Sequence, residues 1–171
     1  MRLLFVTLML ISLCVNAAQP LADLRANKLV KIAHFVDFTH AQSTAIRFCF
    51  YDLSTGVGQA FIEKPDLEVN PHPVDIIDLS ESTKNPELLG RCDITYFEGK
   101  VDNDILAPWL KILPVNTLVI GDNFEFLANG GVIALIQEGD KIRLYVNKES
   151  LEQVNFKIQA RLLSISKFYP N

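Results

Sequence analysis

The chain has 171 residues, of which 49% are hydrophobic and 21% are charged, and its formal net charge is −4. This length and composition are typical of one globular domain with its own hydrophobic core and exclude an intrinsically disordered chain. Because acidic residues outnumber basic ones and no basic stripe occurs, binding to nucleic acid is not expected.

Residues 1–17 have the pattern of a secretory signal peptide. Arg2 provides a positive charge, an apolar run extends from Leu3 to Val15, and cleavage is predicted after Ala17. A membrane anchor is the alternative, but a run of about 13 residues is shorter than the roughly 20 that span a bilayer. We therefore expect an exported, periplasmic protein in which residues 18–171 form a single domain that does not insert into the membrane.

A helical pattern follows the signal sequence. Apolar residues between Leu29 and Val36 recur at the spacing of a buried helix face. Asp23, which precedes this stripe, is predicted as the N-cap of the helix because its carboxylate can accept hydrogen bonds from the first free N–H groups.

The next segments alternate between strand and helix patterns. Runs rich in aromatic and β-branched residues predict strands, and apolar stripes at helical spacing predict helices between them. In chain order these are a strand in AIRFCFYDL (residues 45–53), a short helix from Val57 to Glu63 that ends before Pro65, strands in HPVDIIDLS (72–80) and CDITYFEG (92–99), a helix from Asn103 to Leu113 that ends at Pro114, and a strand in NTLVIG (116–121).

The C-terminal part changes to an antiparallel pattern. VIALIQ (132–137) and KIRLYVN (141–147) are separated by a Glu-Gly-Asp triplet, which predicts a hairpin. Asn147 is predicted as the N-cap of a short helix, Asn155 as the left-handed cap at its end, and QARLLSISK (159–167) as a final helix. The predicted fold is α/β, with a mainly parallel central sheet flanked by helices, a C-terminal antiparallel hairpin and final helices.

No pattern of catalytic residues or metal ligands emerges. The three histidines, His34, His40 and His72, lack metal-ligand spacing with another histidine or a cysteine. No P-loop, G-x-S-x-G elbow or C-x-x-C pair occurs. Gly56-Val57-Gly58 resembles the start of a dinucleotide-binding motif, but Phe61 occupies the place of its third glycine. We therefore expect no enzymatic activity, no metal and no cofactor.

Two cysteines remain after removal of the signal peptide. Cys14 lies in the signal sequence, which leaves Cys49 and Cys92. In an oxidising compartment they can form one disulfide, which would close a loop of about 44 residues and stabilise the fold by roughly 4 kcal/mol. Two buried thiols that only pack are the alternative, which a cytosolic location would favour.

A double glycine, Gly130-Gly131, precedes the predicted hairpin. No lysine with a following Ser or Thr comes after it in P-loop spacing, and a strand rather than a helix follows. We therefore assign both glycines a backbone role, in which unusual torsion angles turn the loop from Phe124 to Leu127 into the next strand.

Several segments, taken in order, match one known pattern. RANKLVKIAHFVDFT, IRFCFYD and LLGRCDITYF are followed by TLVIGDNFEFLANGGVIALIQEGDKIRLYVNKESLEQVNFKIQARLLSISK. This order resembles the first helix, the first strand, a later strand and the whole C-terminal part of the YfiR family of exported regulators. The resemblance covers roughly residues 25–167, and Gly130, Gly131 and Asn147 match directly.

That resemblance implies a small periplasmic α/β protein that is not an enzyme. The best-known members of the YfiR family bind the periplasmic sensor domain of YfiN, an inner-membrane diguanylate cyclase, and hold it inactive, so the resemblance implies a repressor that lowers cyclic di-GMP and biofilm formation. The resemblance also implies a homodimer and a redox-controlled cysteine pair. Cys49 and Cys92 lie at the two positions of that pair.

The segment before the double glycine departs from the family pattern. Phe124-Glu125 stand where the family has Pro-Gly, which adds an aromatic residue. Aromatic residues are common anchors of protein interfaces, so we expect contact with the partner through Phe124, Phe126 and Leu127. Packing of these side chains into the core below the hairpin is the alternative.

A second function compatible with the sequence is a periplasmic small-ligand-binding module that serves a different membrane sensor or transporter. The cleft at the carboxyl ends of the parallel strands would then hold the ligand. The sequence supplies no cluster of convergent polar residues around Gly130-Gly131 to bind it.

Overall fold

The computed structural model describes residues 18–38, 44–64, 66–80, 86–99, 101–113 and 115–170. The predicted signal peptide (residues 1–17), the helix-ending prolines Pro65 and Pro114, and His40 lie outside these ranges. Among the helices within them, none is both long and apolar enough to cross a membrane.

Strands and helices alternate along the chain, in agreement with the apolar patterns. The strands are β1 Val36–Asp37, β2 Ile46–Phe50, β3 Glu68–Val69, β4 His72–Asp78, β5 Ile94–Tyr96, β6 Leu118–Gly121, β7 Ile133–Glu138, β8 Lys141–Asn147, β9 Lys157–Ile158 and β10 Lys167–Tyr169. The helices are α1 Ala18–Ala33, α2 Gly56–Ile62, the 3-10 helix η1 Pro86–Arg91, α3 Asn103–Ile112, α4 Phe124–Ala128, α5 Lys148–Leu151 and α6 Ala160–Ser164.

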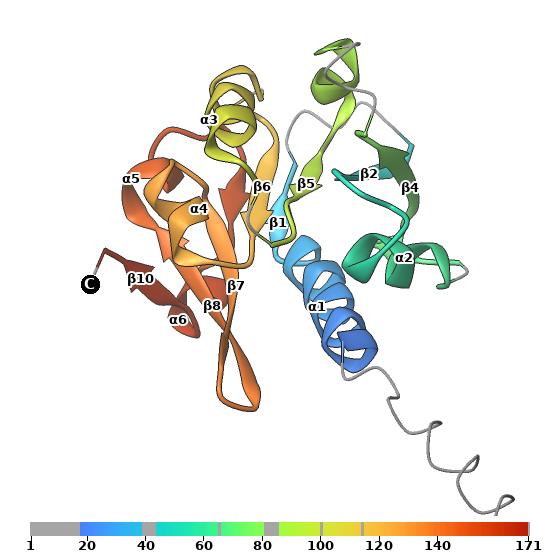
Figure 1. Cartoon of the computed structure of the whole chain (residues 1–171), viewed down its shortest axis with the longest axis horizontal. Helices are drawn as coiled ribbons and strands as arrows, with labels where there is room; N and C mark the ends of the chain where they lie inside the picture. Colours follow the sequence, from blue (N-terminus) through green and yellow to red (C-terminus); the bar gives the residue numbers. More distant parts are fainter. Residues whose placement is uncertain are drawn as a thin grey trace, which may run out of the picture.

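One sheet contains eight of the strands, in the order β10-β8-β7-β6-β5-β2-β4-β3 (Figure 1). The central strands β4, β2, β5, β6 and β7 are parallel to one another. β7 and β8 form the antiparallel hairpin, and β10 is a parallel edge strand beside β8. The predicted α/β fold, with a mainly parallel sheet and a C-terminal hairpin, is confirmed.

The direction of winding, meaning the side on which the chain adds the next strand to the sheet, reverses between β2 and β5. From β2 the chain passes through α2 to β4 on one side, and later from β5 through α3 to β6 on the other side. Because parallel crossovers are right-handed, α2 and α3 cover opposite faces of the sheet. α1 packs beside α2 (Figure 1). Helices on both faces explain why β5 and β6 are buried along their whole lengths.

The first helix begins earlier than its sequence pattern indicates. Asp23 lies inside α1 rather than at its N-cap, because the buried face already includes Ala22 and continues through Ala26 at helical spacing. α1 ends at Ala33, and Val36 belongs to β1, where it pairs with Ile158 of β9. The prediction of Asp23 as a cap is therefore wrong.

The segment after Asn147 also differs from its prediction. α5 ends at Leu151, so Asn155 is not at its C-cap. In the described part of the chain, the non-glycine residues with positive φ are Asp66 and Asn70. The left-handed conformation predicted for Asn155 is therefore wrong. Its backbone N–H instead donates a hydrogen bond to the carbonyl of Val115, at 3.1 Å.

The predicted final helix is shorter than its sequence pattern, and a strand follows it. α6 ends at Ser164, and Lys167–Tyr169 pair with Tyr145–Asn147 as the edge strand β10. The strands β1, β3, β9 and β10 have two or three residues each, too few for an alternation pattern to identify them. The three residues of β5 were located because they lie within a longer run of aromatic and β-branched residues.

The ring of Phe126 determines how β6, α4 and β7 meet. A Cβ atom added to Gly121 would lie 2.4 Å from this ring, and one added to Gly131 would lie 2.0 Å from it. Phe126 itself is 2% exposed. Both positions require glycine because the ring occupies the space of a side chain. Gly130 differs from them, because its φ of 98° turns the chain after α4. The unusual torsion angle predicted for both glycines is therefore found at Gly130, whereas Gly131 has no positive φ and is needed for its lack of a side chain.

Gly131→Ala should lower the free energy of unfolding by about 1–3 kcal/mol, because the new methyl group overlaps the Phe126 ring. Gly90→Ala is the matched control, since no heavy atom lies within 4 Å of a Cβ added there. Urea unfolding of each variant, with and without Phe126→Ala, forms a double-mutant cycle. The cost of Gly131→Ala should largely disappear in the Phe126→Ala background, and an equal cost in both backgrounds would contradict this packing.

Candidate functional site

The segment predicted as a loop from Phe124 to Leu127 is part of the short helix α4. Asn123 is its N-cap, with Oδ1 accepting a hydrogen bond from the N–H of Phe126 at 2.8 Å. Helical periodicity turns Phe126 and Leu127 into the core, where they are 2% and 0% exposed, whereas Phe124 is 45% exposed. The expected contact residues are therefore corrected: in this fold Phe124 is accessible, and Phe126 and Leu127 are packing residues.

Phe124 is part of an aromatic group that we name the Phe124 cluster, made up of Phe124, Tyr145 and Tyr169. The ring centroid of Phe124 lies 4.9 Å from that of Tyr145 and 6.1 Å from that of Tyr169. Tyr145 is on β8 and Tyr169 is on the neighbouring edge strand β10. The cluster thus joins α4 to two strands at the β10 edge of the sheet.

Two charged residues border the Phe124 cluster. Lys167 Nζ lies 2.7 Å from Glu138 Oε1 and 5.2 Å from the centroid of the Tyr145 ring. The hydroxyl of Tyr145 donates a hydrogen bond to Glu138. The hydrogen bond between Glu138 and Lys167 lowers the pKa of the Glu138 carboxyl group and raises the pKa of the Lys167 amine. An aromatic centre with a charged margin is the typical composition of a protein-binding surface.

Internal hydrogen bonds fix the orientation of α4. Asn147 Nδ2 donates to the carbonyl of Leu127 at 2.9 Å, while Oδ1 accepts from the N–H of Ser150 at 3.2 Å as the N-cap of α5. The N–H of Gly131 donates to the carbonyl of Phe126 at 3.0 Å and closes the end of α4. Because α4 is held at both ends, the outward direction of Phe124 is fixed by the fold.

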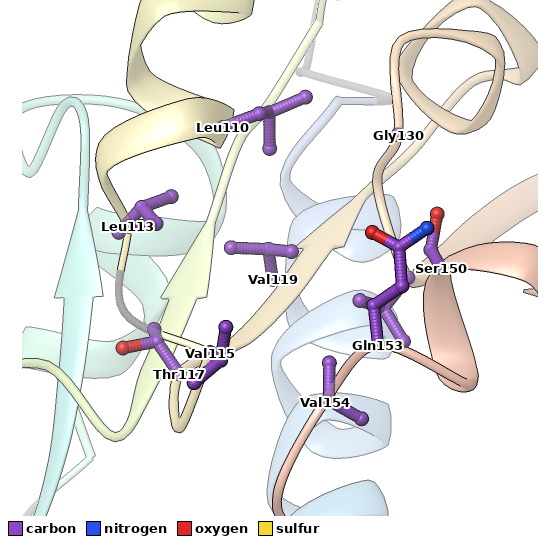
Figure 2. Close-up of a pocket in the computed structure, with 10 residues that line it drawn as sticks. Leu110, Leu113, Val115, Thr117, Val119, Gly130, Ser150, Gln153 and Val154 are labelled. Atoms are coloured by element: carbon purple, nitrogen blue, oxygen red, sulfur yellow. The ribbon is translucent and has the colours of Figure 1, made fainter.

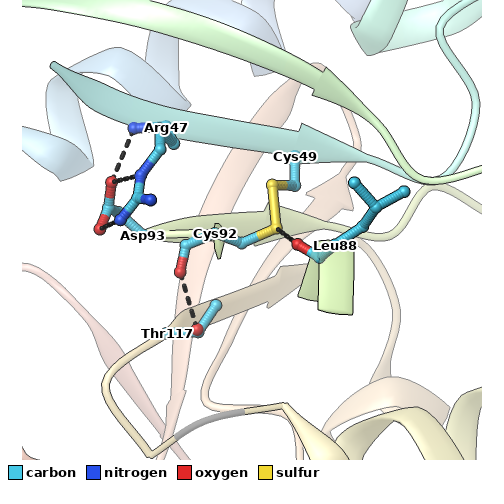
Figure 3. Close-up of a disulfide and its surroundings, with 6 residues drawn as sticks. All are labelled: Arg47, Cys49, Leu88, Cys92, Asp93 and Thr117. Atoms are coloured by element: carbon cyan, nitrogen blue, oxygen red, sulfur yellow. Dashed lines mark hydrogen bonds and ion pairs between the residues drawn. A yellow bond between two sulfur atoms is a disulfide. The ribbon is translucent and has the colours of Figure 1, made fainter. Parts of the chain in front are cut away.

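A disulfide joins Cys49 and Cys92, with an S–S distance of 2.01 Å (Figure 3). Cys49 is the fourth residue of β2 and Cys92 lies just before β5, so the bond crosses the point where the winding of the sheet reverses. The two residues are 0% and 5% exposed. The structure therefore contains the bonded pair rather than two packed thiols.

Polar contacts hold the segment that carries Cys92 (Figure 3). Asp93 accepts hydrogen bonds from Arg47 Nε at 3.0 Å and from Arg47 Nη2 at 3.1 Å. This paired hydrogen bonding raises the pKa of Arg47. The hydroxyl of Thr117, at the entry to β6, donates to the carbonyl of Cys92 at 2.8 Å. β2, β5 and β6 are thus connected around the disulfide.

Replacing both cysteines by alanine should lower the free energy of unfolding by about 4 kcal/mol, because the bond spans 43 positions of the sequence and constrains the unfolded chain. Urea unfolding of the oxidised protein and of the Cys49→Ala, Cys92→Ala variant measures this difference. Equal stability of the two proteins would contradict the assignment, as would two thiols that react with an alkylating agent before denaturation.

A second polar group lies at the carboxyl ends of β5 and β6. Arg25 of α1 is 3.3 Å from Asp122 and 4.0 Å from Glu98. Glu98 also accepts a hydrogen bond from the N–H of Val57, at 2.8 Å. The side chains of Arg25 and Asp122 are 12% and 8% exposed. Sequence reasoning missed this group because its members are far apart in the chain and meet only where the strands end.

This group fills the crevice in which doubly wound α/β proteins usually bind a ligand. The adjacent cavity, lined in part by Asp52, Gly58, Tyr96 and Glu98, has a volume of about 20 Å³. That is room for about one water molecule and too little for an organic ligand. Among the described residues, the part of this crevice beside Glu98 therefore contains the protein's own side chains and leaves too little space for an organic ligand.

Burial raises the pKa of Glu98. The folded protein then binds this proton more tightly than the unfolded chain, so this residue's contribution to stability falls as pH rises from the ordinary glutamate value through the raised pKa. Glu98→Gln removes the titration and retains an acceptor for the N–H of Val57. The melting temperature of Glu98→Gln minus that of the unchanged protein should increase between about pH 4 and pH 7. A difference independent of pH would contradict the raised pKa.

The remaining candidates from the sequence are structural. Gly58 lies where an added Cβ would be 2.2 Å from the carbonyl oxygen of Asp52, so its glycine serves close packing. His34 Nδ1 is 2.8 Å from Asn70 Oδ1. Within the described ranges, no group of three or more His, Cys, Asp or Glu residues is placed to hold a metal ion.

Comparisons with known proteins identify a matching family and solved structures with a similar fold. A family model described as YfiR/HmsC-like matches residues 22–167. No curated protein matches the chain. Six chains of solved structures match, including the crystal structure of a conserved domain protein from Vibrio cholerae O1 biovar El Tor, with a TM-score of 0.58 and 12% identity. The match covers 86% of this chain and 59% of that chain, so this chain spans less than two thirds of its neighbour. At this identity the likeness shows the fold alone.

Proposed function

Because the chain belongs to the YfiR/HmsC-like family, we propose that it is a periplasmic regulator that represses an inner-membrane diguanylate cyclase. It does so by binding the periplasmic sensor domain of that cyclase, which lowers cyclic di-GMP and biofilm formation. The disulfide between Cys49 and Cys92 supports an exported location, since such bonds persist in oxidising compartments.

Repression of this kind requires the regulator to bind two conformations of the cyclase with different affinities. A regulator shifts the cyclase toward its inactive conformation only if it binds that conformation more tightly than the active one. The regulator needs no catalytic group for this task, but it does need a surface that is accessible and held in a fixed shape.

The Phe124 cluster is the observation that carries the proposal. Phe124 combines a large exposed apolar side chain with a helix held by Asn123, Asn147 and the buried Phe126. A rigid aromatic anchor loses little conformational entropy when a partner covers it. The adjacent Glu138 and Lys167 supply a charged margin that can select the partner.

The alternative function is a small-ligand-binding module that serves a different membrane sensor or transporter. That function was expected to use the crevice at the carboxyl ends of the strands. Arg25, Glu98 and Asp122 fill the crevice with internal contacts, which counts against a ligand there. Family membership and the Phe124 cluster both favour the regulator.

Phe124→Asp should weaken binding to the periplasmic domain of the partner cyclase by at least tenfold, because a carboxylate would replace the apolar anchor. Its melting temperature should stay within a few degrees of the unchanged protein, since Phe124 is 45% exposed. Calorimetric titration with the purified sensor domain measures the affinity, and cyclic di-GMP in cells that produce each variant measures repression.

Ile62→Asp is the matched control, because Ile62 is a similarly exposed apolar residue, 56% exposed, on α2 away from the Phe124 cluster. It should bind the sensor domain as the unchanged protein does. Phe126→Asp should unfold the protein, since its ring is buried between two glycines. If folded Phe124→Asp binds the sensor domain and represses the cyclase as well as the unchanged protein does, the Phe124 cluster is not part of the interface.

A further inference from the structure

A second cavity lies on the α3 face of the sheet, about 90 Å³ in volume (Figure 2). Its walls come from α3, the segment after α3, the strand β6, the segment between α4 and β7, and α5 with the residues that follow it. The lining residues are Leu110, Leu113, Val115, Thr117, Val119, Gly130, Val132, Ser150, Gln153 and Val154. None of them is charged, and most are aliphatic.

Two of the three polar side chains that line this cavity lie on one side of it, and the third, Thr117, donates its hydroxyl hydrogen to the carbonyl of Cys92. Figure 2 shows the hydroxyl of Ser150 and the amide of Gln153 next to each other, with the aliphatic side chains of Leu110, Leu113 and Val119 across from them. The cavity therefore has an aliphatic wall and a neutral hydrogen-bonding wall.

The cavity is preformed by contacts that do not involve a ligand. The N–H of Asn155 donates to the carbonyl of Val115 at 3.1 Å and holds the segment after α5 against the segment after α3. The hydroxyl of Thr117 donates a hydrogen bond to the carbonyl of Cys92, at 2.8 Å. Apart from its chain neighbours, no heavy atom lies within 4 Å of a Cβ added to Gly130, so there is open space beside this residue. These internal contacts hold the lining segments in place without a ligand.

We infer that this cavity binds a small uncharged amphipathic molecule, with a short aliphatic chain of about four carbons and one neutral hydroxyl or amide group. The size follows from the volume, which is smaller than the roughly 150 Å³ of a protein cavity that holds benzene. The aliphatic chain lies against Leu110, Leu113 and Val119, and the polar group lies against Ser150 and Gln153.

The lining selects against charged ligands. None of the described residues that line the cavity is charged, so a carboxylate or an ammonium group would lose its hydration without gaining an ionic partner among them. The site is separate from the Phe124 cluster, and its existence does not depend on the proposed repression of a cyclase.

Nuclear magnetic resonance on the ¹⁵N-labelled, oxidised exported protein tests this site with 1-butanol as the probe. Titration should give saturable shifts at the amides of Gly130, Val132 and Ser150, with a dissociation constant in the millimolar range expected for so small a ligand. Butyrate and butylammonium, which have the same chain with a charged group, should bind at least tenfold more weakly. Shifts that stay linear and spread over the whole protein, or butyrate binding as tightly as butanol, would overturn the inference.

Two variants and one control variant test whether the chemical-shift changes come from the cavity. Val154→Trp fills the space and should abolish saturable binding, whereas Ile62→Trp, at an exposed position on α2, should leave it unchanged. Gln153→Leu removes the amide at an exposed position and should weaken butanol binding several-fold. Butanol binding retained by folded Val154→Trp overturns the inference. If Val154→Trp does not fold, unchanged affinity in Gln153→Leu overturns it.

Discussion

The packing of the Phe126 ring against Gly121 and Gly131 is the contact on which the C-terminal half of the protein depends. The ring takes the space of two side chains, which brings α4 directly onto the ends of β6 and β7. Helical periodicity then directs Phe124 outward, two residues before the buried ring. The same packing places the turn at Gly130 and the start of the hairpin. A buried aromatic residue and two glycines therefore set the position of the exposed aromatic residue that the proposed function uses.

Two further sets of contacts fasten the sheet at its point of reversed winding. The disulfide and the Arg47–Asp93 pair connect β2 with the entry to β5. At the carboxyl ends of the strands, Arg25 of α1 contacts Asp122 and Glu98. Beside these contacts, among the described residues, the cavity lined by Tyr96 and Glu98 has a volume of about 20 Å³, too small for a nucleotide or another organic ligand. This arrangement suits a protein that acts through its surface.

The sequence predicted the features that depend on neighbouring residues. Apolar runs located β2, β5 and β6, and the hairpin followed from its turn residues. Features that depend on distant residues were missed or mistaken. Asp23 was wrongly predicted as a cap because the buried helix face was taken to begin after it, whereas α1 already begins at Ala18. The segment at Phe124 was predicted as a loop, although Asn123 is the N-cap of a helix there. The edge strand β10 and the Arg25 group form only when remote segments meet, so local patterns could not reveal them.

The proposed function requires α4 to present Phe124 to a membrane-bound cyclase. Photo-crosslinking in cells tests this contact, with p-benzoylphenylalanine replacing Phe124 in one protein and Ile62 in a second, and mass spectrometry of the cross-linked products. We expect a cross-link from position 124 to the periplasmic domain of an inner-membrane diguanylate cyclase, and none from position 62. A cross-link to that domain from position 62 but not from position 124, or no cross-link to any such cyclase from either, would contradict the claim.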